Sequence, residues 1–241
     1  MKLKKAISAV ILAASAAVLL PTGAQAQTSA VSLNVPQFGG TPAESDSATE
    51  QPKPLTAVTA FVDAPTEIFP TLDRMTRMDM VDYYDSGSQR PSKNAFKGDA
   101  RILAASPAQV TVRTSDVSVV ELTLLEQKRD TLFMVITTLS TPAEDSSVKF
   151  YTREWKPVEG LFVVPLLDDW TREEARDRKD DLENNIPFML ARCTYVPETG
   201  TLTLTNNLGS YLPEEALGLA EGSLPQLISY EWDGTKMVRI K

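Results

Sequence analysis

The segment from Asp99 to Trp155 constrains the fold most strongly, because its apolar residues recur with a period of two. Such a period is typical of strands, and the intervening loops are short, so consecutive strands should pair as antiparallel hairpins. The run from Thr131 to Ile136 is apolar on both faces, which predicts a central strand covered on both sides. The expected strands of this meander are Ala100–Ala105, Gln109–Thr114, Val117–Glu126, Thr131–Ser140 and Val148–Trp155.

A helix is predicted before the meander, over residues 69–84, where apolar residues follow one another at steps of three. Arg74 and Arg77 lie off this stripe. The methionines of the stripe are expected to fill the core. The stripe consists of Leu72, Met75, Met78, Val81 and Tyr84.

The rest of the chain predicts a second group of helices and strands. A charged helix should follow Trp170, over Thr171–Glu183, and reach the core mainly through Trp170, Ala175, Leu182 and Ile186. A short helix is expected over Pro213–Ala220. Asp233-Gly234 is a strong hairpin signal. The expected strands are Met189–Val196, Thr201–Asn206, Gln226–Trp232 and Lys236–Ile240.

These elements predict an α+β fold, in which a helix is followed by an antiparallel meander, arranged as two halves on one core. The halves would be residues 55–157 and 158–241. Each ends with a similar aromatic strand, Val148–Trp155 and Leu227–Trp232, which favours two related halves. Two unrelated halves remain an open alternative.

The N-terminus has the pattern of a cleavable signal peptide over residues 1–26, with basic residues, an apolar stretch and Ala24-Gln25-Ala26 before the cut. The apolar stretch is shorter than the ~20 residues of a spanning helix, so no membrane span is expected after cleavage. The protein should therefore be periplasmic or secreted. Residues 27–54 are rich in Ser, Thr and Pro, which predicts a flexible linker. Within it, Ser47 lies in a sequence that resembles a Bacteroidetes O-glycosylation site, although an unmodified linker is the simpler expectation.

Composition excludes several kinds of function. The 241 residues contain no histidine and one cysteine, which excludes a Ser-His-Asp triad, a His-ligated metal and a disulfide within the chain. The net charge of −8 argues against nucleic acid as a partner. Cys193 lies on an expected strand and is interpreted as a small buried apolar residue. No cofactor is predicted.

The remaining candidates are acidic and aromatic residues that could form an interaction surface. Asp79, Asp82 and Asp85 would share one helix face, where a hard cation is an alternative to a solvated acidic surface. No catalytic, cofactor-binding or metal-ligating residue is predicted. The aromatic candidates, for which core packing is the competing interpretation, are Tyr83, Tyr84, Tyr151, Trp155, Tyr230 and Trp232.

Three blocks of the sequence, residues 69–84, residues 145–151 with Trp155, and residues 200–208, resemble a secreted Bacteroidales family classed as a domain of unknown function. The resemblance spans about residues 56–241. It implies an extracytoplasmic protein of a bacterium with two membranes, and it implies no reaction.

The leading functional hypothesis is therefore a non-catalytic extracytoplasmic module that binds an unknown protein or glycan on an antiparallel sheet face. One alternative is a carbohydrate hydrolase that uses two carboxylates and no histidine. Another is a small carrier that encloses an apolar ligand. Sheet geometry should separate them, because a hydrolase needs opposed carboxyls across a cleft and a carrier needs a dry cavity.

Overall fold

The computed structural model describes residues 54–127 and 130–240. The predicted signal peptide, the linker apart from its last residue, and Ser47 lie outside these described residues. Residues Gln51–Lys241 form one compact unit. Within the described part of the chain, the helices are too short or too polar to cross a lipid bilayer.

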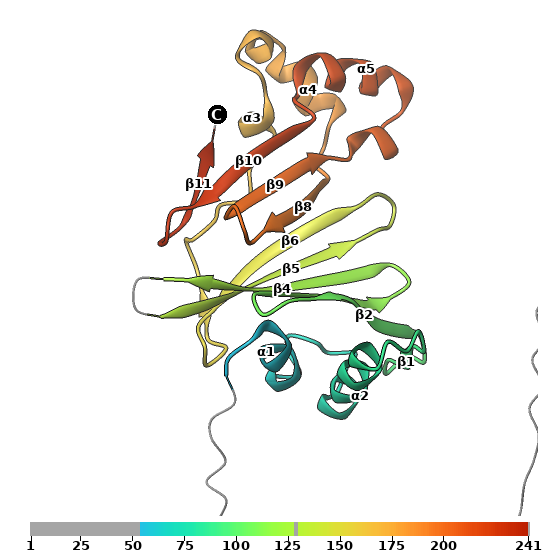
Figure 1. The fold of residues 1–241 in the computed structure, drawn as a ribbon. Coiled ribbons are helices and arrows are strands. Elements are labelled where there is room, and N and C mark those ends of the chain that lie inside the picture. Colours follow the sequence, from blue (N-terminus) through green and yellow to red (C-terminus); the bar gives the residue numbers. More distant parts are fainter. Residues whose placement is uncertain (1–53, 128–129, 241) are drawn as a thin grey trace, which may run out of the picture. The chain divides into compact units, whose positions relative to one another are not determined.

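The predicted meander forms an antiparallel seven-stranded sheet in which β1 to β7 lie in sequence order (Figure 1). Strands β2 to β5 agree with the prediction to within one residue at each end. Strand β6 begins and ends earlier than predicted, and β1 and β7 were not predicted because two residues carry no periodic pattern. The strands are β1 Ser92–Lys93, β2 Asp99–Ala105, β3 Gln109–Ser115, β4 Ser118–Glu126, β5 Thr131–Leu139, β6 Asp145–Tyr151 and β7 Pro157–Val158.

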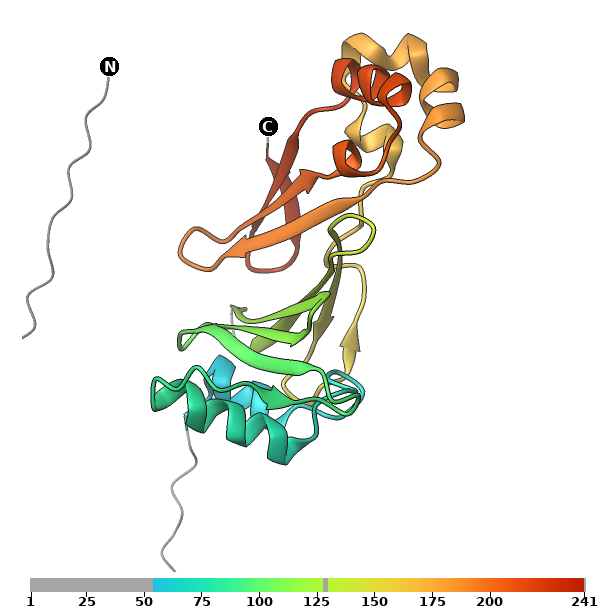
Figure 2. The ribbon, with the colours of Figure 1, turned by 90° about the vertical axis from the view of Figure 1, so that its right-hand side faces the viewer.

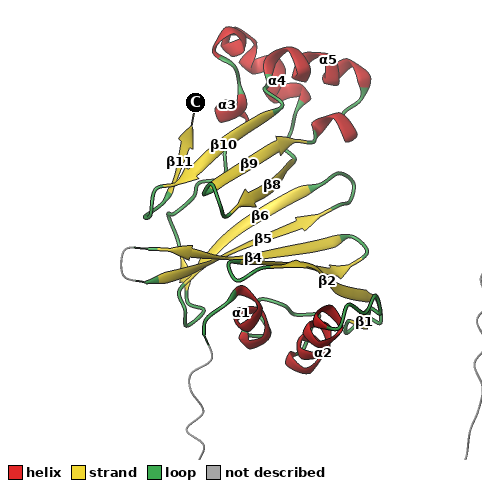
Figure 3. Ribbon diagram, viewed as in Figure 1, coloured by secondary structure: helices red, strands yellow, loops and turns green. Residues whose placement is uncertain are grey.

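The predicted strands of the second half form an antiparallel four-stranded sheet with the order β11-β10-β9-β8 (Figure 3). The hairpin at Asp233-Gly234 is confirmed, and Gly234 has a φ of +87°, which glycine adopts without strain. The strands are β8 Ala191–Val196, β9 Thr201–Asn206, β10 Leu227–Trp232 and β11 Met237–Ile240.

Two helices pack on one face of the seven-stranded sheet (Figure 2). Helix α1, Ala57–Asp63, was not predicted; it begins with a capping box between Thr56 and Thr59. Helix α2, Arg74–Asp85, starts later than predicted, at an N-cap where the Asp73 carboxylate accepts a 2.7 Å hydrogen bond from the Thr76 amide.

The predicted apolar stripe on α2 is wrong. Met75 is 65% exposed, whereas Arg77 and Met80 are buried. An α-helix turns about 100° per residue, so residues three apart drift around the helix by about 60° at each step. Arg77 lies inside because its Nη2 donates to the Ala64 carbonyl at 2.6 Å and its guanidinium lies 5.6 Å from the centre of the Phe69 ring.

The predicted charged helix is divided into two short pieces, Glu173–Arg178 and Lys179–Asn185, although its predicted core residues Trp170, Ala175, Leu182 and Ile186 are all buried. The short helix near residue 213 is confirmed as α5. The helical segments of this half are α3 Leu167–Trp170, η1 Glu173–Arg178, α4 Lys179–Asn185, η2 Leu208–Ser210 and α5 Glu214–Ser223.

The core consists of two clusters, so the expectation of one core is wrong. One cluster lies between α1, α2 and the seven-stranded sheet. The other joins the opposite face of that sheet to the four-stranded sheet and the segments α3 to α5. Strand β5 separates them: Met134 and Ile136 belong to one cluster and Phe133 and Val135 to the other, which confirms the prediction of a strand covered on both sides. A relationship between the two halves stays a prediction.

Side chains of the seven-stranded sheet form hydrogen bonds with backbone groups at the outer edge of β8. The Ala191 amide donates to the Asp145 carboxylate at 3.1 Å, and the Cys193 amide donates to the Ser146 hydroxyl at 2.9 Å. The Gln109 amide group donates to the Tyr195 carbonyl at 3.2 Å. We call these contacts the inter-sheet seam. Cys193 is buried there, as predicted, and burial raises the pKa of its thiol to about 12.

Glu121 of β4 is 9% exposed and lies beside the inter-sheet seam. Burial raises the pKa of its carboxyl above its ordinary value of 4.5, and Arg192 and the Tyr195 backbone lower it in part. Between the unfolded and folded pKa values the folded state holds more protons, so the free energy of unfolding should fall as the pH rises through this window.

Glu121→Gln should remove this loss of stability. The variant's free energy of unfolding, measured by urea denaturation at a series of pH values above 4.5, should rise relative to wild type as the pH increases. Glu231→Gln, on an exposed position of β10, is the control. Parallel pH profiles for wild type and Glu121→Gln would contradict the expectation.

Candidate functional site

The structure distributes the nine candidate residues over three places. Helix α2 carries Asp79, Asp82, Tyr83, Tyr84 and Asp85. The end of β6 and the turn that follows carry Tyr151 and Trp155, and β10 carries Tyr230 and Trp232. The candidates therefore do not form one continuous surface.

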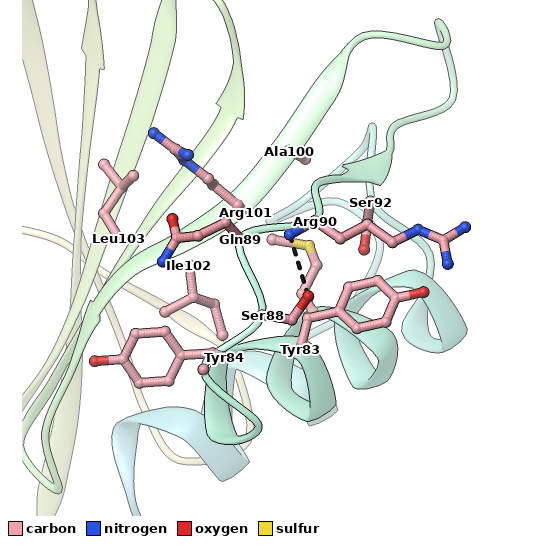
Figure 4. A pocket seen from close by; sticks show the side chains of 12 residues that line it. Tyr83, Tyr84, Ser88, Gln89, Arg90, Ser92, Ala100, Arg101, Ile102 and Leu103 are labelled. Carbon is pink, nitrogen blue, oxygen red and sulfur yellow. Dashed lines mark hydrogen bonds between the residues drawn. The ribbon is translucent and has the colours of Figure 1, made fainter. Parts of the chain in front are cut away.

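A pocket of about 280 Å³ lies between the C-terminal half of α2 and strand β2 (Figure 4). Met80 and Ile102 give it an apolar lining, and Tyr83 and Tyr84 stand on opposite sides of it. We call it the α2–β2 pocket. It is small for a ligand pocket, and polar residues such as Gln89 and Arg90 supply much of its lining.

The chain reverses after α2 to complete the α2–β2 pocket. Gly87 has a φ of +69°, and the segment Ser88–Arg90 then runs back along the pocket toward β1. The Ser88 hydroxyl accepts a 3.2 Å hydrogen bond from the Arg90 amide, and the Arg90 guanidinium lies 5.5 Å from the centre of the Tyr83 ring. A left-handed glycine thus permits the turn that brings Arg90 beside Tyr83.

Two hydroxyl groups of the α2–β2 pocket have different roles. The Tyr84 hydroxyl accepts a 3.1 Å hydrogen bond from the Ala105 amide, which ties the end of α2 to β2. The Ser92 hydroxyl is buried and has no hydrogen-bond partner among the described residues. A buried polar group of this kind is expected to find a partner, and a ligand in the pocket can supply one.

The three aspartates of α2 are exposed and lie outside the lining of the α2–β2 pocket. Within the described part of the chain, no three carboxylate or cysteine side chains come together as a metal-binding group. The pocket lining itself contains two arginines, Arg90 and Arg101, and no acidic residue.

The backbone of β2 has an open edge beside this pocket. Strand β1 pairs only with Asp99 and Ala100, whereas β3 pairs with β2 along its other side as far as Ala105. Four consecutive β2 residues, Ala100–Leu103, line the pocket. The edge from Arg101 to Leu103 therefore faces the pocket rather than another strand of the described chain.

Tyr151 and Trp155 line a groove of about 740 Å³, which we call the β6–β7 groove. Trp155 has a φ of +61°, an uncommon backbone conformation for a non-glycine residue, and its ring lies 4.5 Å from that of Phe133. Glu67 and Glu159 also line the groove. These two aromatic candidates are thus near one another and partly accessible.

Tyr230 is buried in the core, and Trp232 is half-buried and packs against it. Tyr230 is 8% exposed and lies edge-on to Phe162, with 5.1 Å between ring centres. The Trp232 indole N–H donates to the Glu126 carbonyl at 3.0 Å, and its ring is stacked 6.4 Å from that of Phe150. For these two residues core packing is the observed role.

Sequence reasoning missed Gln89, Arg90, Ser92 and Arg101, which complete the α2–β2 pocket. The first three follow the helix in a segment without periodicity, so no pattern marked them. The alternation of β2 did place Arg101 on the face opposite Ala100 and Ile102, and that signal could have identified it.

One family model matches residues 52–237, a range that contains the whole α2–β2 pocket. The chain belongs to the DUF3256 family of proteins of unknown function. The expected membership of such a family is confirmed, whereas secretion stays a prediction. No curated protein matches the chain.

A solved domain of an uncharacterized protein from Porphyromonas gingivalis W83 is similar to this DUF3256 chain, with a TM-score of 0.65 and 23% sequence identity. The match covers 76% of this chain and 98% of that domain. At this identity the likeness shows the fold alone, so the site must be judged on its own geometry.

Tyr84→Phe should loosen the connection between α2 and β2, because it removes the acceptor of the Ala105 amide. We expect a loss of about 0.5–1 kcal/mol in the free energy of unfolding. Hydrogen exchange should also become faster at the Ala105 amide. Tyr83→Phe is the matched control, and equal exchange at Ala105 in both variants would contradict the assigned contact.

Proposed function

We propose that this DUF3256 protein is a non-catalytic, extracytoplasmic binding module. Its ligand would be an extended segment of a partner protein that adds to the edge of β2 and places one side chain in the α2–β2 pocket. The observation that carries this proposal is that Ala100–Leu103 line the pocket, while β1 leaves the edge from Arg101 to Leu103 unpaired.

An unpaired strand edge presents backbone N–H and C=O groups that another chain can bind. In strand addition, these backbone bonds supply affinity and pockets for alternate side chains supply specificity. Both parts are present here, because the open edge and the pocket share the same residues. The buried Ser92 hydroxyl adds a polar group that lacks a partner in the described chain.

A glycan ligand is the second candidate, and the β6–β7 groove is the observation that favours it. Its volume of about 740 Å³ lies within the usual range of ligand pockets, and Tyr151 and Trp155 supply aromatic surface. The hydrolase alternative would rest on Glu67 and Glu159 of the same groove. The single carboxyl with a raised pKa in the described chain, Glu121, lies beside the inter-sheet seam instead.

Location outside the cytoplasm rests on the predicted signal peptide. N-terminal sequencing of the protein purified from its native host should begin at Gln27. Substitution of Ala26 by a large residue should prevent this cut. An intact Met1 in the native protein would contradict the extracytoplasmic part of the proposal.

Photo-crosslinking tests the proposed binding edge. A benzophenone amino acid at Leu103, which is 38% exposed beside the pocket, should form an adduct with an extended segment of a partner in cells that make the protein. The amides of Arg101–Leu103 that face the open edge should exchange more slowly in the complex. The matched control is Phe188, which is 47% exposed in the other half.

An adduct that forms equally from Leu103 and Phe188 would contradict the proposed edge. So would an adduct from Leu103 that leaves the exchange of the β2 amides unchanged. Adducts from Tyr151 or Trp155 in place of Leu103 would favour the β6–β7 groove.

A further inference from the structure

We infer that the segment bound at β2 is acidic, and that Arg101 and Arg113 together hold one of its carboxylates. This inference rests on the proposed function, because it names the chemistry of the partner at the same edge. Its basis is a pair of arginines that the sheet register places directly opposite one another.

Arg101 of β2 and Arg113 of β3 are cross-strand partners. Side chains of directly opposed residues lie on the same face of a sheet, with Cβ atoms about 4.5–5.5 Å apart. Like charges in this arrangement repel one another. A carboxylate between the two guanidiniums would offset the repulsion and could accept hydrogen bonds from both.

Neither arginine has a carboxylate partner in the described chain. The ion pairs there involve other cations, among them Arg74 with Asp63 and Arg192 with Glu144. Asp99 is the nearest acidic residue along β2, and it is bound by Lys93. The two guanidiniums therefore remain available to an external anion.

The two faces of β2 differ in chemistry, so they favour different side chains on the bound segment. Ala100 and Ile102 point toward the core under α1 and α2, and Arg101 and Arg113 lie on the opposite face. Figure 4 shows the Arg101 side chain directed away from Tyr83 and Arg90. Side chains of an added strand alternate between the same two faces.

A side chain that enters the pocket meets a different lining. Met80 and Ile102 belong to this lining, whereas the exposed Asp79, Asp82 and Asp85 of α2 lie outside it. An apolar residue suits the lining of Met80 and Ile102. The favoured ligand is therefore a segment in which apolar and acidic residues alternate, with the acidic residues on the arginine face.

Fluorescence anisotropy with defined peptides tests the inference on the full-length protein. The probe is a labelled octapeptide in which valine and glutamate alternate, and the same peptide with glutamine in place of glutamate is its control. The glutamate peptide should bind about tenfold more tightly, and added salt should weaken it more than the control.

Variants of Arg101 and Arg113 test whether these two side chains cause the preference for the glutamate peptide. Arg101→Gln and Arg113→Gln should each bring the two peptides to nearly equal affinity, and Arg113→Lys should retain part of the preference because it keeps charge without the planar fork. Arg153→Gln, an exposed arginine in the turn after β6, should leave the preference unchanged. Circular dichroism confirms that each variant is folded.

Equal binding of both peptides by the wild type would overturn the acidic-segment inference while leaving strand addition at β2 intact. Absence of glutamate-peptide binding would also overturn it, and the Leu103 crosslink then decides whether the proposed edge survives. An oligogalacturonate of equal charge is the third probe. Tighter binding of this acidic glycan than of the peptide would overturn the assignment to a protein segment.

Discussion

Strand β5 must be covered on both faces, and the rest of the structure depends on this constraint. Phe133 and Val135 point to one side and Met134 and Ile136 to the other, and all four are almost fully removed from water. A strand of this kind needs a layer on each side of its sheet. Helices α1 and α2 supply one layer, and the four-stranded sheet with α3 to α5 supplies the other. The position of α2 beside β2, and so the pocket, follows from the first of these layers.

The strands were predictable because their side chains alternate with a period of two, and short loops left one simple order for them. The face of α2 was not predictable from the same kind of pattern. Arg77 occupies an interior position where a sequence pattern expects an apolar residue, and it does so through contacts with Ala64 and Phe69. Those residues belong to the segment between α1 and α2, whose conformation no periodicity reports. The buried Arg77 therefore gives α2 an interior face that differs from the one predicted by its apolar stripe.

The candidate site likewise combines residues that a sequence pattern marks with residues that no pattern marks. Tyr83 and Tyr84 could be predicted, because aromatic residues on a helix are visible as a motif. Ser92, Arg101 and Arg113 could not be combined with them, since their proximity depends on sheet register. A bulge lies between Ile102 and Ala104, and a second irregularity lies between Arg113 and Ser115. A shift of one residue on either strand would send one arginine to the opposite face, so only the folded register makes the pair.

The other strand edges are closed or short, which explains why the proposed partner segment is placed at β2. Strand β8 is closed by side chains of the larger sheet, and the Met237 amide of β11 donates to the Leu161 carbonyl at 2.8 Å. Strand β7 is two residues long and contains Pro157, which lacks an amide donor. At β2, the contacts of β1 end at Ala100 and the Tyr84 hydroxyl closes the edge at Ala105. The backbone between these two contacts lies beside the pocket and next to a cationic pair. An edge that is closed at both ends in this way limits the register of an added strand, because a bound segment has a fixed length of backbone to occupy.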